Sequence, residues 1–211
     1  MDITGRKLFV KALQEEGVDT IFAYPGGMVT DIVDELYKQD SIHVVLPRHE
    51  QALIHEAEGY ARATGRVGVC LVTSGPGATN TITGIADAMM DSTPIVVIAG
   101  QVGASLLGSD AFQECDLVGV TQPISKWAYQ IRRPEDVAWA VSRAFYIAKS
   151  GRPGPVVLDF AKNAQVGLVD YEPQGTDFIR SYVPVPKTDP WAIRQAAALI
   201  NNAKRPFILV G

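Results

Sequence analysis

Two uninterrupted apolar runs most strongly constrain what this chain can fold into. Residues Val67 to Thr73 and Pro94 to Ala99 carry almost only apolar side chains. A strand that is apolar on both faces is typical of the buried interior of a parallel sheet. Parallel strands need a crossover between them, and Ile82, Ile85 and Met89 repeat at helical spacing between these two runs. The sequence therefore predicts a βαβ unit at the centre of an α/β sheet.

The same alternation continues on both sides of this unit. Apolar runs predict four further strands, at residues 20–23, 42–46, 127–131 and 155–160. Helical spacing predicts helices at residues 4–16, 29–38, 50–64 and from 134 onward, with Thr4 capping the first and Gly17 and Gly65 ending two of them. Alternating strands and helices indicate right-handed crossovers. We therefore predict an open, doubly wound parallel sheet of six strands with helices on both faces, within residues 1–163.

The composition changes after residue 163. Residues 164–188 are interrupted by proline and glycine and show no clear periodicity, which is typical of a linker. A helical pattern begins at Asp189, and an apolar run at 205–211 predicts a strand. One helix and one strand cannot bury their apolar faces alone. Residues 189–211 are therefore expected to begin a second α/β domain that is truncated here.

Composition excludes several classes of function. The 211 residues carry a net charge of -4, which gives no electrostatic footprint for nucleic acid. No apolar stretch is long enough to span a bilayer, and no basic amphipathic helix suggests a membrane surface. The N-terminus shows no secretory signal, and the two cysteines, Cys70 and Cys115, are expected to be buried thiols in a reducing compartment. A cytoplasmic location is expected.

Glu50 is the residue whose position first suggests a function. The apolar run at 42–46 ends at Pro47, and the next helical pattern starts at His49 or Glu50. This places one carboxylate in the first turn of a helix, just beyond a strand end, where open α/β sheets bind ligands. Acidic residues also favour helix N-termini because of the helix dipole. Position alone leaves both explanations open.

A second candidate is the turn Gly75-Pro-Gly77-Ala-Thr-Asn80, between a buried strand and a helix. Its backbone N–H groups could hold an anion, although it is neither a dinucleotide fingerprint nor a P-loop. A tight turn with close helix packing explains the glycines equally well. No metal site is expected, because His49 and His55 are six residues apart and lie on different faces of the helix. Glu56 and Glu58 are expected on its solvated face.

The connection at residues 101–126 is long, and loops of such length inside a compact domain are usually functional. It is expected to hold a short helical piece near Phe112 to Val118. Phe112 and Gln113 could be a substrate wall and a hydrogen-bond donor, but a helix start at Asp110 to Glu114 is the favoured interpretation. Lys162 follows the last strand, at the sheet edge where sites collect.

Several motifs together resemble a known family. They are Ala23-Tyr-Pro-Gly-Gly27, Arg48-His-Glu-Gln51, Glu58-Gly-Tyr-Ala-Arg-Ala-Thr-Gly65, Thr73-Ser-Gly-Pro-Gly-Ala-Thr-Asn80, Gly100-Gln-Val102, Asp110-Ala-Phe-Gln-Glu114 and Ser150-Gly-Arg-Pro-Gly-Pro155. Over essentially its whole length the chain resembles the N-terminal, pyrimidine-binding domain of thiamine-diphosphate enzymes. The Asp-Ala-Phe-Gln-Glu block makes it most similar to the catalytic large subunit of acetohydroxyacid (acetolactate) synthases.

The resemblance implies a flavodoxin-like fold and a set of residue roles. The Glu matching Glu50 hydrogen-bonds N1′ of the cofactor aminopyrimidine, which promotes loss of the thiazolium C2 proton. The remaining residues carry over by position: Gly26, Gly27 and Asn80 at the cofactor, Arg152 at FAD, and Phe112, Gln113, Lys162 and Met28 along the substrate channel. Met28 replaces a usual Ala, Ala52 replaces a common Gly, and Phe160-Ala-Lys-Asn163 departs from a more typical Pro-Lys-Asp ending.

The resemblance also implies partners. Pyruvate or another 2-oxo acid is the expected substrate, with thiamine diphosphate, Mg²⁺ and FAD as cofactors. A second copy of the chain completes the active site, and a regulatory small subunit is possible in such enzymes. The Gly-Asp-Gly…Asn motif that holds the diphosphate and Mg²⁺ does not occur in these residues, so the isolated chain is expected to be inactive. The alternatives are another thiamine-diphosphate-dependent decarboxylase, oxidase or carboligase, and a non-catalytic nucleotide-binding α/β module.

Overall fold

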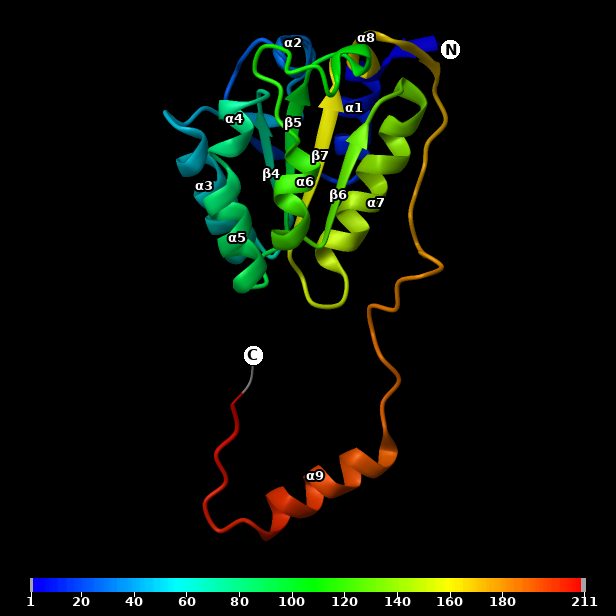
Figure 1. Ribbon diagram of the computed structural model, residues 1–211. Helices are drawn as coiled ribbons and strands as arrows, with labels where there is room; N and C mark the ends of the chain where they lie inside the picture. Colours follow the sequence, from blue (N-terminus) through cyan, green and yellow to red (C-terminus); the bar gives the residue numbers. More distant parts are fainter. Residues whose placement is uncertain (1, 210–211) are drawn as a thin grey trace.

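The computed structural model describes residues 2–209, which form an α/β domain followed by an extended C-terminal segment (Figure 1). The centre of the domain is a six-stranded sheet in the order β3-β2-β4-β5-β7-β6, in which every neighbouring pair is parallel. The strands are β2 (Thr20–Ala23), β3 (His43–Val45), β4 (Gly68–Val72), β5 (Ile95–Gln101), β6 (Trp127–Ile131) and β7 (Pro155–Ala161). All six strands lie at the predicted places, within two residues at each end.

Helices cover both faces of the sheet (Figure 1). One face packs against α1 (Gly5–Glu15), α2 (Thr30–Tyr37), α7 (Val137–Lys149) and α8 (Lys162–Val166). The other face packs against α3 (Glu50–Thr64), α4 (Pro76–Thr79), α5 (Ile82–Met90) and α6 (Leu117–Thr121). The central strands β4, β5 and β7 are buried at every position, because side chains on both of their faces meet a helical layer. The predicted open, doubly wound sheet is confirmed.

The strand order places a topological switch point between β2 and β4. From β2 the chain crosses outward to β3, then returns past β2 and continues through β4 and β5 on the other side. The loops that follow β2 and β4 therefore leave the carboxyl edge of the sheet in opposite directions. This is the place where open α/β sheets bind ligands.

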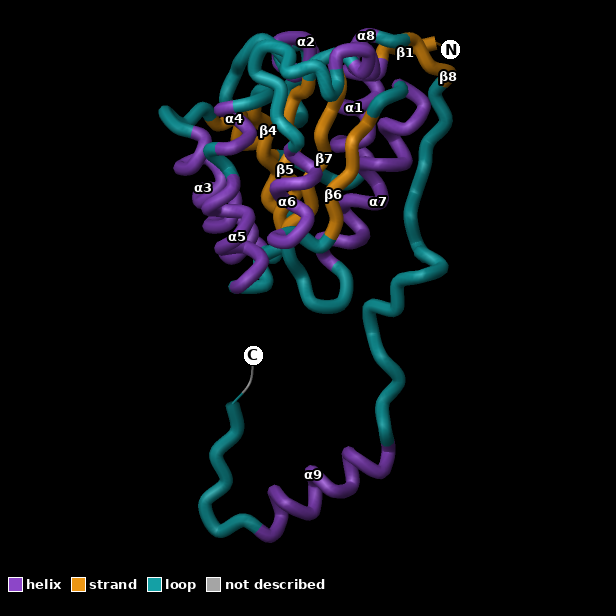
Figure 2. Tube along the Cα trace, viewed as in Figure 1, coloured by secondary structure: helices purple, strands orange, loops and turns teal. Residues whose placement is uncertain are grey.

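A small second sheet was not predicted. Strand β1 (Asp2–Thr4) pairs antiparallel with β8 (Leu168–Asp170), so the start of the chain lies beside the end of the domain (Figure 2). Thr4 holds the N-cap position of α1, but its side chain makes no capping hydrogen bond, contrary to prediction. Three-residue strands carry too little sequence pattern to be recognised without their partner.

Part of residues 164–188 packs on the domain. These residues include the end of α8, all of β8, and Ile179, which is 5% exposed. The hydroxyl of Tyr182 donates to the backbone carbonyl of Ser150 (2.9 Å) and so fastens the segment near the end of α7. The chain is exposed at every described residue only from Val185 onward.

Residues 101–126 contain short helical turns but no helix start at Asp110. The turns are η1 (Ala104–Leu106), α6 and η2 (Gln122–Ile124), and a further turn, η3 (Pro134–Asp136), precedes α7. Asp110 and Gln113 have φ angles of 56° and 57°, which no α-helix accommodates. The Glu114 carboxylate instead accepts hydrogen bonds from the backbone N–H groups of Gly108 and Ala111, and it closes this stretch into a compact turn. The favoured interpretation of residues 110–114 was therefore wrong.

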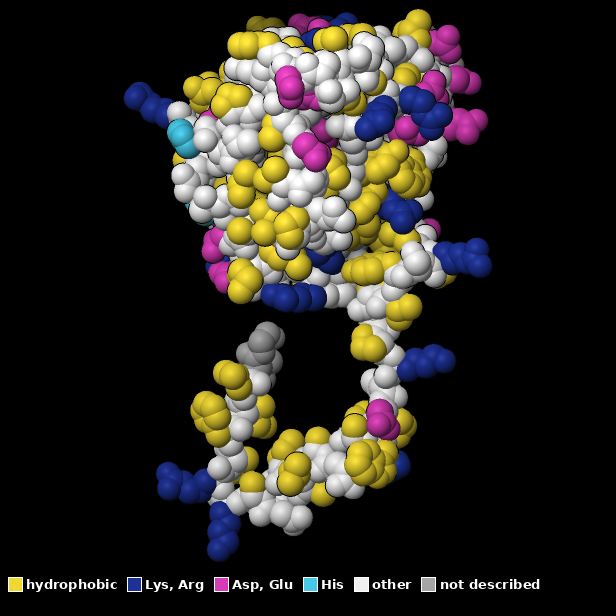
Figure 3. Space-filling model, in the orientation of Figure 1, with side chains coloured by type: hydrophobic (Ala, Val, Ile, Leu, Met, Phe, Trp, Pro, Cys, Tyr) yellow, Lys and Arg dark blue, Asp and Glu magenta, His cyan; other side chains and the backbone are white. Residues whose placement is uncertain are grey.

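The C-terminal segment holds one helix, α9 (Pro190–Asn202), whose described residues are all exposed. Large apolar side chains lie on it, including Trp191, Ile193 and Leu199 (Figure 3). Residues 205–209 form no strand, because a strand needs a neighbour to pair with and the described chain offers none there. The rest of that predicted strand, residues 210–211, lies outside the described residues. Within residues 2–209, every helix is too short or too polar to cross a membrane.

Candidate active site

Most of the predicted site residues gather at the carboxyl edge of the sheet, around the switch point. They lie in the loops that follow β2, β4 and β5, at the start of α8 after β7, and at the start of α3. The loops after β2 and β4 are joined by a hydrogen bond from the backbone N–H of Met28 to the Thr73 hydroxyl, two residues that are 45 positions apart in sequence. Helix α8 is joined to the loop after β2 by the bond from Gln165 to Met28.

Glu50 is the first residue of α3, as predicted. The preceding His49 is extended (φ -155°), and its Nδ1 accepts a hydrogen bond from the backbone N–H of Gln51 (3.0 Å), which satisfies one of the free donors of the first turn. The Glu50 side chain is half-buried, and its Oε2 accepts a hydrogen bond from Asn80 Nδ2 (3.0 Å). Asn80 comes from the turn after α4, so this bond joins the two strongest candidates of the sequence. Asn80 fixes the direction of one carboxylate oxygen.

Glycines bring the backbone close to this carboxylate. A Cβ on Gly77 would lie 3.4 Å from Glu50 Oε1 and 2.7 Å from the Thr73 methyl group. A Cβ on Gly26 would lie 2.5 Å from the Thr73 side chain. Thr73 therefore fills the space between the two glycine loops, and neither loop tolerates a side chain at that point. Its hydroxyl also accepts a hydrogen bond from the backbone N–H of Met28 (3.3 Å).

The loop after β2 is held by polar groups from α8 and α2. Lys162 Nζ donates to the backbone carbonyl of Gly27 (3.4 Å) and forms an ion pair with Asp31 (2.6 Å). Hydrogen bonding to Lys162 lowers the pKa of Asp31 below its usual value. Buried Gln165 donates to the backbone carbonyl of Met28 (2.8 Å). The loop is thus fixed through its backbone, and Lys162 is anchored by a carboxylate beside it.

The loop after β5 reaches over the glycine turn. A Cβ on Gly75, which has a φ of 59°, would lie 2.7 Å from the backbone oxygen of Gln113. The predicted Gln113 therefore touches the turn through its main chain. The side chain of the neighbouring Phe112 is 83% exposed, so most of its surface contacts no other residue of the described chain. Both residues lie at the same sheet edge as Glu50.

A buried carboxylate holds the base of that loop. Asp159, in β7, is fully buried, and its Oδ2 accepts hydrogen bonds from Gln101 Nε2 (3.2 Å) and Gln130 Nε2 (2.7 Å). Burial raises the pKa of Asp159 from 3.8 to about 6. Gln101 Nε2 also donates to the backbone carbonyl of Cys115 (2.8 Å). The end of β5 and the end of the loop are therefore fastened to one buried carboxylate.

A surface hollow of about 490 Å³ adjoins the start of α3. Its lining residues follow β2 and β3 and include Tyr24, Pro25, Leu46 and Arg48. Leu46 is 64% exposed, so the wall beside the Glu50 segment is partly apolar. The hollow and the half-buried Glu50 carboxylate therefore lie at the same edge of the sheet, with Arg48 of the hollow two residues before Glu50.

Arg152 does not belong to this group. It lies between α7 and β7, at the opposite end of the sheet from Glu50. Its guanidinium donates to the backbone carbonyls of Met89 (3.0 Å) and Met90 (2.9 Å) and to the Ser92 hydroxyl (2.8 Å). These carbonyls end helix α5 and have no partner within it, so a cation is favourable there. In the described chain Arg152 therefore caps a helix, and its predicted contact with FAD stays a prediction.

Three residues that support the site were not predicted. Thr73 had a weak signal, because it is the polar residue that ends a buried strand. Gln165 had no such signal, because a glutamine in the polar stretch Lys-Asn-Ala-Gln is expected at the surface. Asp31 looked like an ordinary acidic residue in the first turn of a helix, and only the fold brings Lys162 beside it. All three act through contacts between segments distant in sequence.

Comparison with known proteins agrees with this arrangement. Residues 3–120 match the family described as thiamine pyrophosphate enzyme, N-terminal TPP binding domain. The chain is 46% identical over 211 residues to the acetolactate synthase large subunit of Haemophilus influenzae, and 47% identical over 211 residues to the acetolactate synthase isozyme 3 large subunit of Escherichia coli. A probable acetolactate synthase large subunit of Methanocaldococcus jannaschii is 47% identical over 211 residues.

These alignments cover 98–99% of this chain but only 35–37% of each relative. The chain therefore spans about a third of the length of the curated relatives that it matches. The family match itself covers more than half of the chain, and it includes Glu50, the glycine turn and the loop at 110–114. The chain belongs to the thiamine pyrophosphate enzymes, as a member of their N-terminal TPP-binding domain family.

Proposed function

We propose that this chain is the pyrimidine-binding part of an acetolactate synthase, which decarboxylates pyruvate and joins the product to a second 2-oxo acid. The observation that carries the proposal is the Glu50 carboxylate, oriented by Asn80 and bordered by Gly77 at the switch point. The names of the relatives support the choice of this activity over other thiamine-diphosphate-dependent decarboxylases and oxidases.

Glu50 suits the aminopyrimidine of thiamine diphosphate. Because Gly77 lacks a Cβ, the backbone of the glycine turn lies close to Glu50 Oε1, and Gly26 packs closely on the Thr73 side chain for the same reason. When bound, thiamine diphosphate supplies the electron sink for decarboxylation. Glu50 would hold a proton at the pyrimidine N1′ atom, while Asn80 keeps the second carboxylate oxygen turned toward the glycine turn. Met28 and Lys162, on the loop after β2 and at the start of α8, would border the substrate channel, with Phe112 and Gln113 opposite.

The finer expectations are proposals of the same kind. We propose that the enzyme acts in the cytoplasm as a homodimer or larger assembly, with the active site between subunits. The relatives are named large subunits, which supports a regulatory small subunit as a further partner. Helix α9 would be the first helix of a further domain, because its apolar side chains are exposed in the described chain. Mg²⁺ would be bound outside these residues, and Arg152 would contact FAD from this domain.

The test uses the whole enzyme that carries this chain, assayed for acetolactate formed from pyruvate. Glu50→Gln keeps the shape of the side chain and its bond to Asn80 but cannot hold the N1′ proton as a carboxylate does. We expect kcat to fall at least about 100-fold, the usual contribution of a positioned acid or base. Glu56→Gln, an exposed residue of the same helix, is the matched control and should be unaffected. A wild-type rate for Glu50→Gln would overturn the assignment.

A second measurement tests whether the residues that bind the diphosphate lie outside this chain. Titration calorimetry of the 211-residue chain with thiamine diphosphate and Mg²⁺ is expected to show only weak binding, because the diphosphate-binding motif is absent from its sequence. Sub-micromolar binding would contradict this part of the proposal. It would favour a module that binds its ligand alone.

A further inference from the structure

Glu58 is the residue whose structure differs most from its predicted role. It was expected on the solvated face of α3, but only 3% of it is exposed, whereas Glu56 is exposed as predicted. Helix α5 packs beside α3, and this packing covers Glu58. Burial of a carboxylate is unfavourable unless charge or hydrogen bonds compensate for it. The groups that surround Glu58 are therefore informative.

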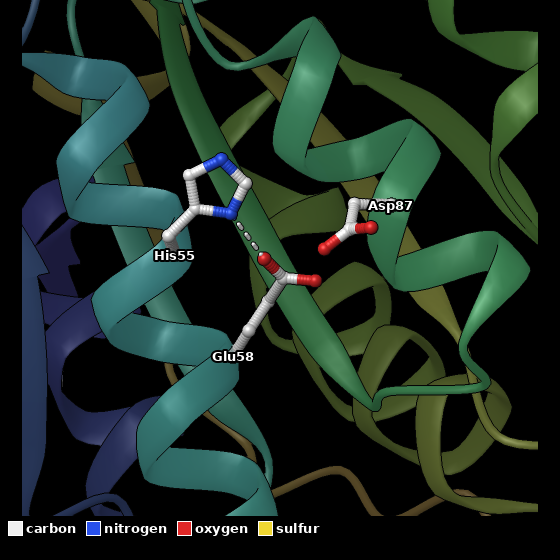
Figure 4. Close-up of side chains that lie close together, drawn as sticks. All are labelled: His55, Glu58 and Asp87. Atoms are coloured by element: carbon white, nitrogen blue, oxygen red, sulfur yellow. Dashed lines mark hydrogen bonds and ion pairs between the residues drawn. The ribbon is translucent and has the colours of Figure 1, made fainter.

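Two side chains face the Glu58 carboxylate (Figure 4). His55, one turn earlier on α3, places its Nδ1 2.6 Å from Glu58 Oε2. Asp87, on α5, points its carboxylate toward the same carboxylate group. The buried Glu58 Oε1 has no hydrogen-bond partner among the described residues. One buried oxygen without a partner thus lies beside a second carboxylate, an arrangement that is favourable only if a proton or a cation lies between them.

We propose that His55, Glu58 and Asp87 form a binding site for a divalent transition metal of the zinc class, which joins helix α3 to helix α5. Each residue offers one ligand atom, and these atoms all lie within 4.8 Å of one another. His49 does not belong to this site. The two ligands on α3 are His55 and Glu58, at positions i and i+3 of the helix. The proposal is independent of the proposed function.

The set of donors favours zinc over magnesium or calcium. An imidazole nitrogen with two carboxylates suits Zn²⁺, whereas Mg²⁺ and Ca²⁺ prefer oxygen ligands alone. Tetrahedral Zn²⁺ with ligands at about 2.0–2.2 Å separates its ligand atoms by about 3.4 Å. In the structure the ligand atoms of His55 and Glu58 lie 2.6 Å apart, and all three ligand atoms lie within 4.8 Å of one another. Side-chain rotations that move these atoms by about 1 Å would bring them to the tetrahedral spacing. Two carboxylates also neutralise the charge of one divalent ion.

The surroundings leave room for a water ligand. The three residues line a surface hollow of about 290 Å³ with Gly59, Arg62 and Asp91. Gly59 has no side chain, and a Cβ there would meet nothing within 4 Å, so this side of the hollow is open. Arg62 is the nearby cation, but its guanidinium is engaged by Asp91 (2.7 Å) and by the Thr93 hydroxyl (3.2 Å). A fourth, open position is usual where zinc has three protein ligands.

The experiment is calorimetric titration of the full chain, freed of metal, with ZnCl₂, supported by the visible spectrum of bound Co²⁺. We expect one Zn²⁺ per chain, a tetrahedral Co²⁺ spectrum, and a melting temperature that rises with zinc concentration. His55→Ala and Asp87→Asn should each weaken binding by at least about 100-fold, since loss of a group that only orients a ligand already weakens sites 10–100-fold. Both side chains are exposed, and circular dichroism would verify that each variant folds.

The controls are His43→Ala and Asp40→Asn, which remove an exposed histidine on β3 and an exposed carboxylate outside the hollow. Neither should change zinc affinity by more than about threefold. Absence of stoichiometric binding would overturn the proposal and indicate that a proton lies between Glu58 and Asp87 instead. Equal binding by wild type and by either ligand variant would also overturn it, because the zinc would then be held elsewhere.

Discussion

Replacement of Asp159 by asparagine tests how the buried carboxylate beneath the loop after β5 affects stability. Asp159 is fully buried, accepts two hydrogen bonds at Oδ2, and has no partner at Oδ1 among the described residues. Asparagine preserves the shape and can still accept from Gln101 and Gln130. It has no charge to bury at any pH.

The magnitude follows from the shift in pKa. Burial raises the pKa of Asp159 from 3.8 to about 6 in the folded protein. The folded state therefore holds the proton more tightly, so this residue contributes stability that is complete below pH 3.8 and is lost as the pH rises through 6. A difference of about 2.2 pKa units corresponds to about 3 kcal/mol in total, of which about 2 kcal/mol falls between pH of about 4.5 and 7.5.

The assay is urea unfolding of wild type and Asp159→Asn at a series of pH values, followed by circular dichroism. The free energy of unfolding of the variant relative to wild type should rise by about 2 kcal/mol from pH of about 4.5 to 7.5. Other carboxylates cancel in this difference. Asp40→Asn, at an exposed aspartate, should give no such slope. A pH-independent difference between Asp159→Asn and wild type would refute the reasoning.

Three further predictions concern packing and accessibility. A Cβ on Gly84 would lie 1.9 Å from the side chain of buried Ile54, so Gly84→Ala should force α5 away from α3 and destabilise the protein by about 1–3 kcal/mol. Gly59→Ala, in a helix and with open space around it, should stabilise by about 0.5–1 kcal/mol, and urea unfolding that ranked the two variants otherwise would contradict the packing. Burial raises the pKa of the Cys70 thiol well above its usual value, whereas Cys115 is partly exposed, contrary to the expectation that both cysteines are buried. A thiol reagent should therefore modify one cysteine in the native protein and both in urea; rapid native modification of both would show that β4 is accessible.

The sequence predicted the sheet because its signal is local and repeated. Each inner strand is a continuous apolar run, and each helix between them has its own periodicity. Glu50 was placed at the first turn of α3 for the same reason, since Pro47 and the helical pattern fix that boundary from both sides. Recognition of several motifs together, rather than position, identified the carboxylate as the cofactor-activating candidate.

The errors concern features that depend on contacts between distant segments. Glu58 looked solvated because its own helix offered no reason to bury it, and the reason is α5, which begins 24 residues later. Strands β1 and β8 are each too short to show alternation, and pairing across the length of the domain defines them. The turn at residues 110–114 resembled a helix start because the backbone bonds of Glu114 that close it cannot be read from residue types.

The pairing of β1 with β8 has a consequence for protein engineering. It brings residue 2 beside residue 170, so the part of the chain that builds the two sheets begins and ends at the same place, and residues 171–184 then pack on the domain. A short peptide could join these ends, and proteins with adjoining ends tolerate circular permutation. The new termini could open at the exposed Gly151 turn, at the end of the sheet opposite Glu50. Conversely, any tag fused before Asp2 would sit beside Asp170, where the chain leaves the small sheet.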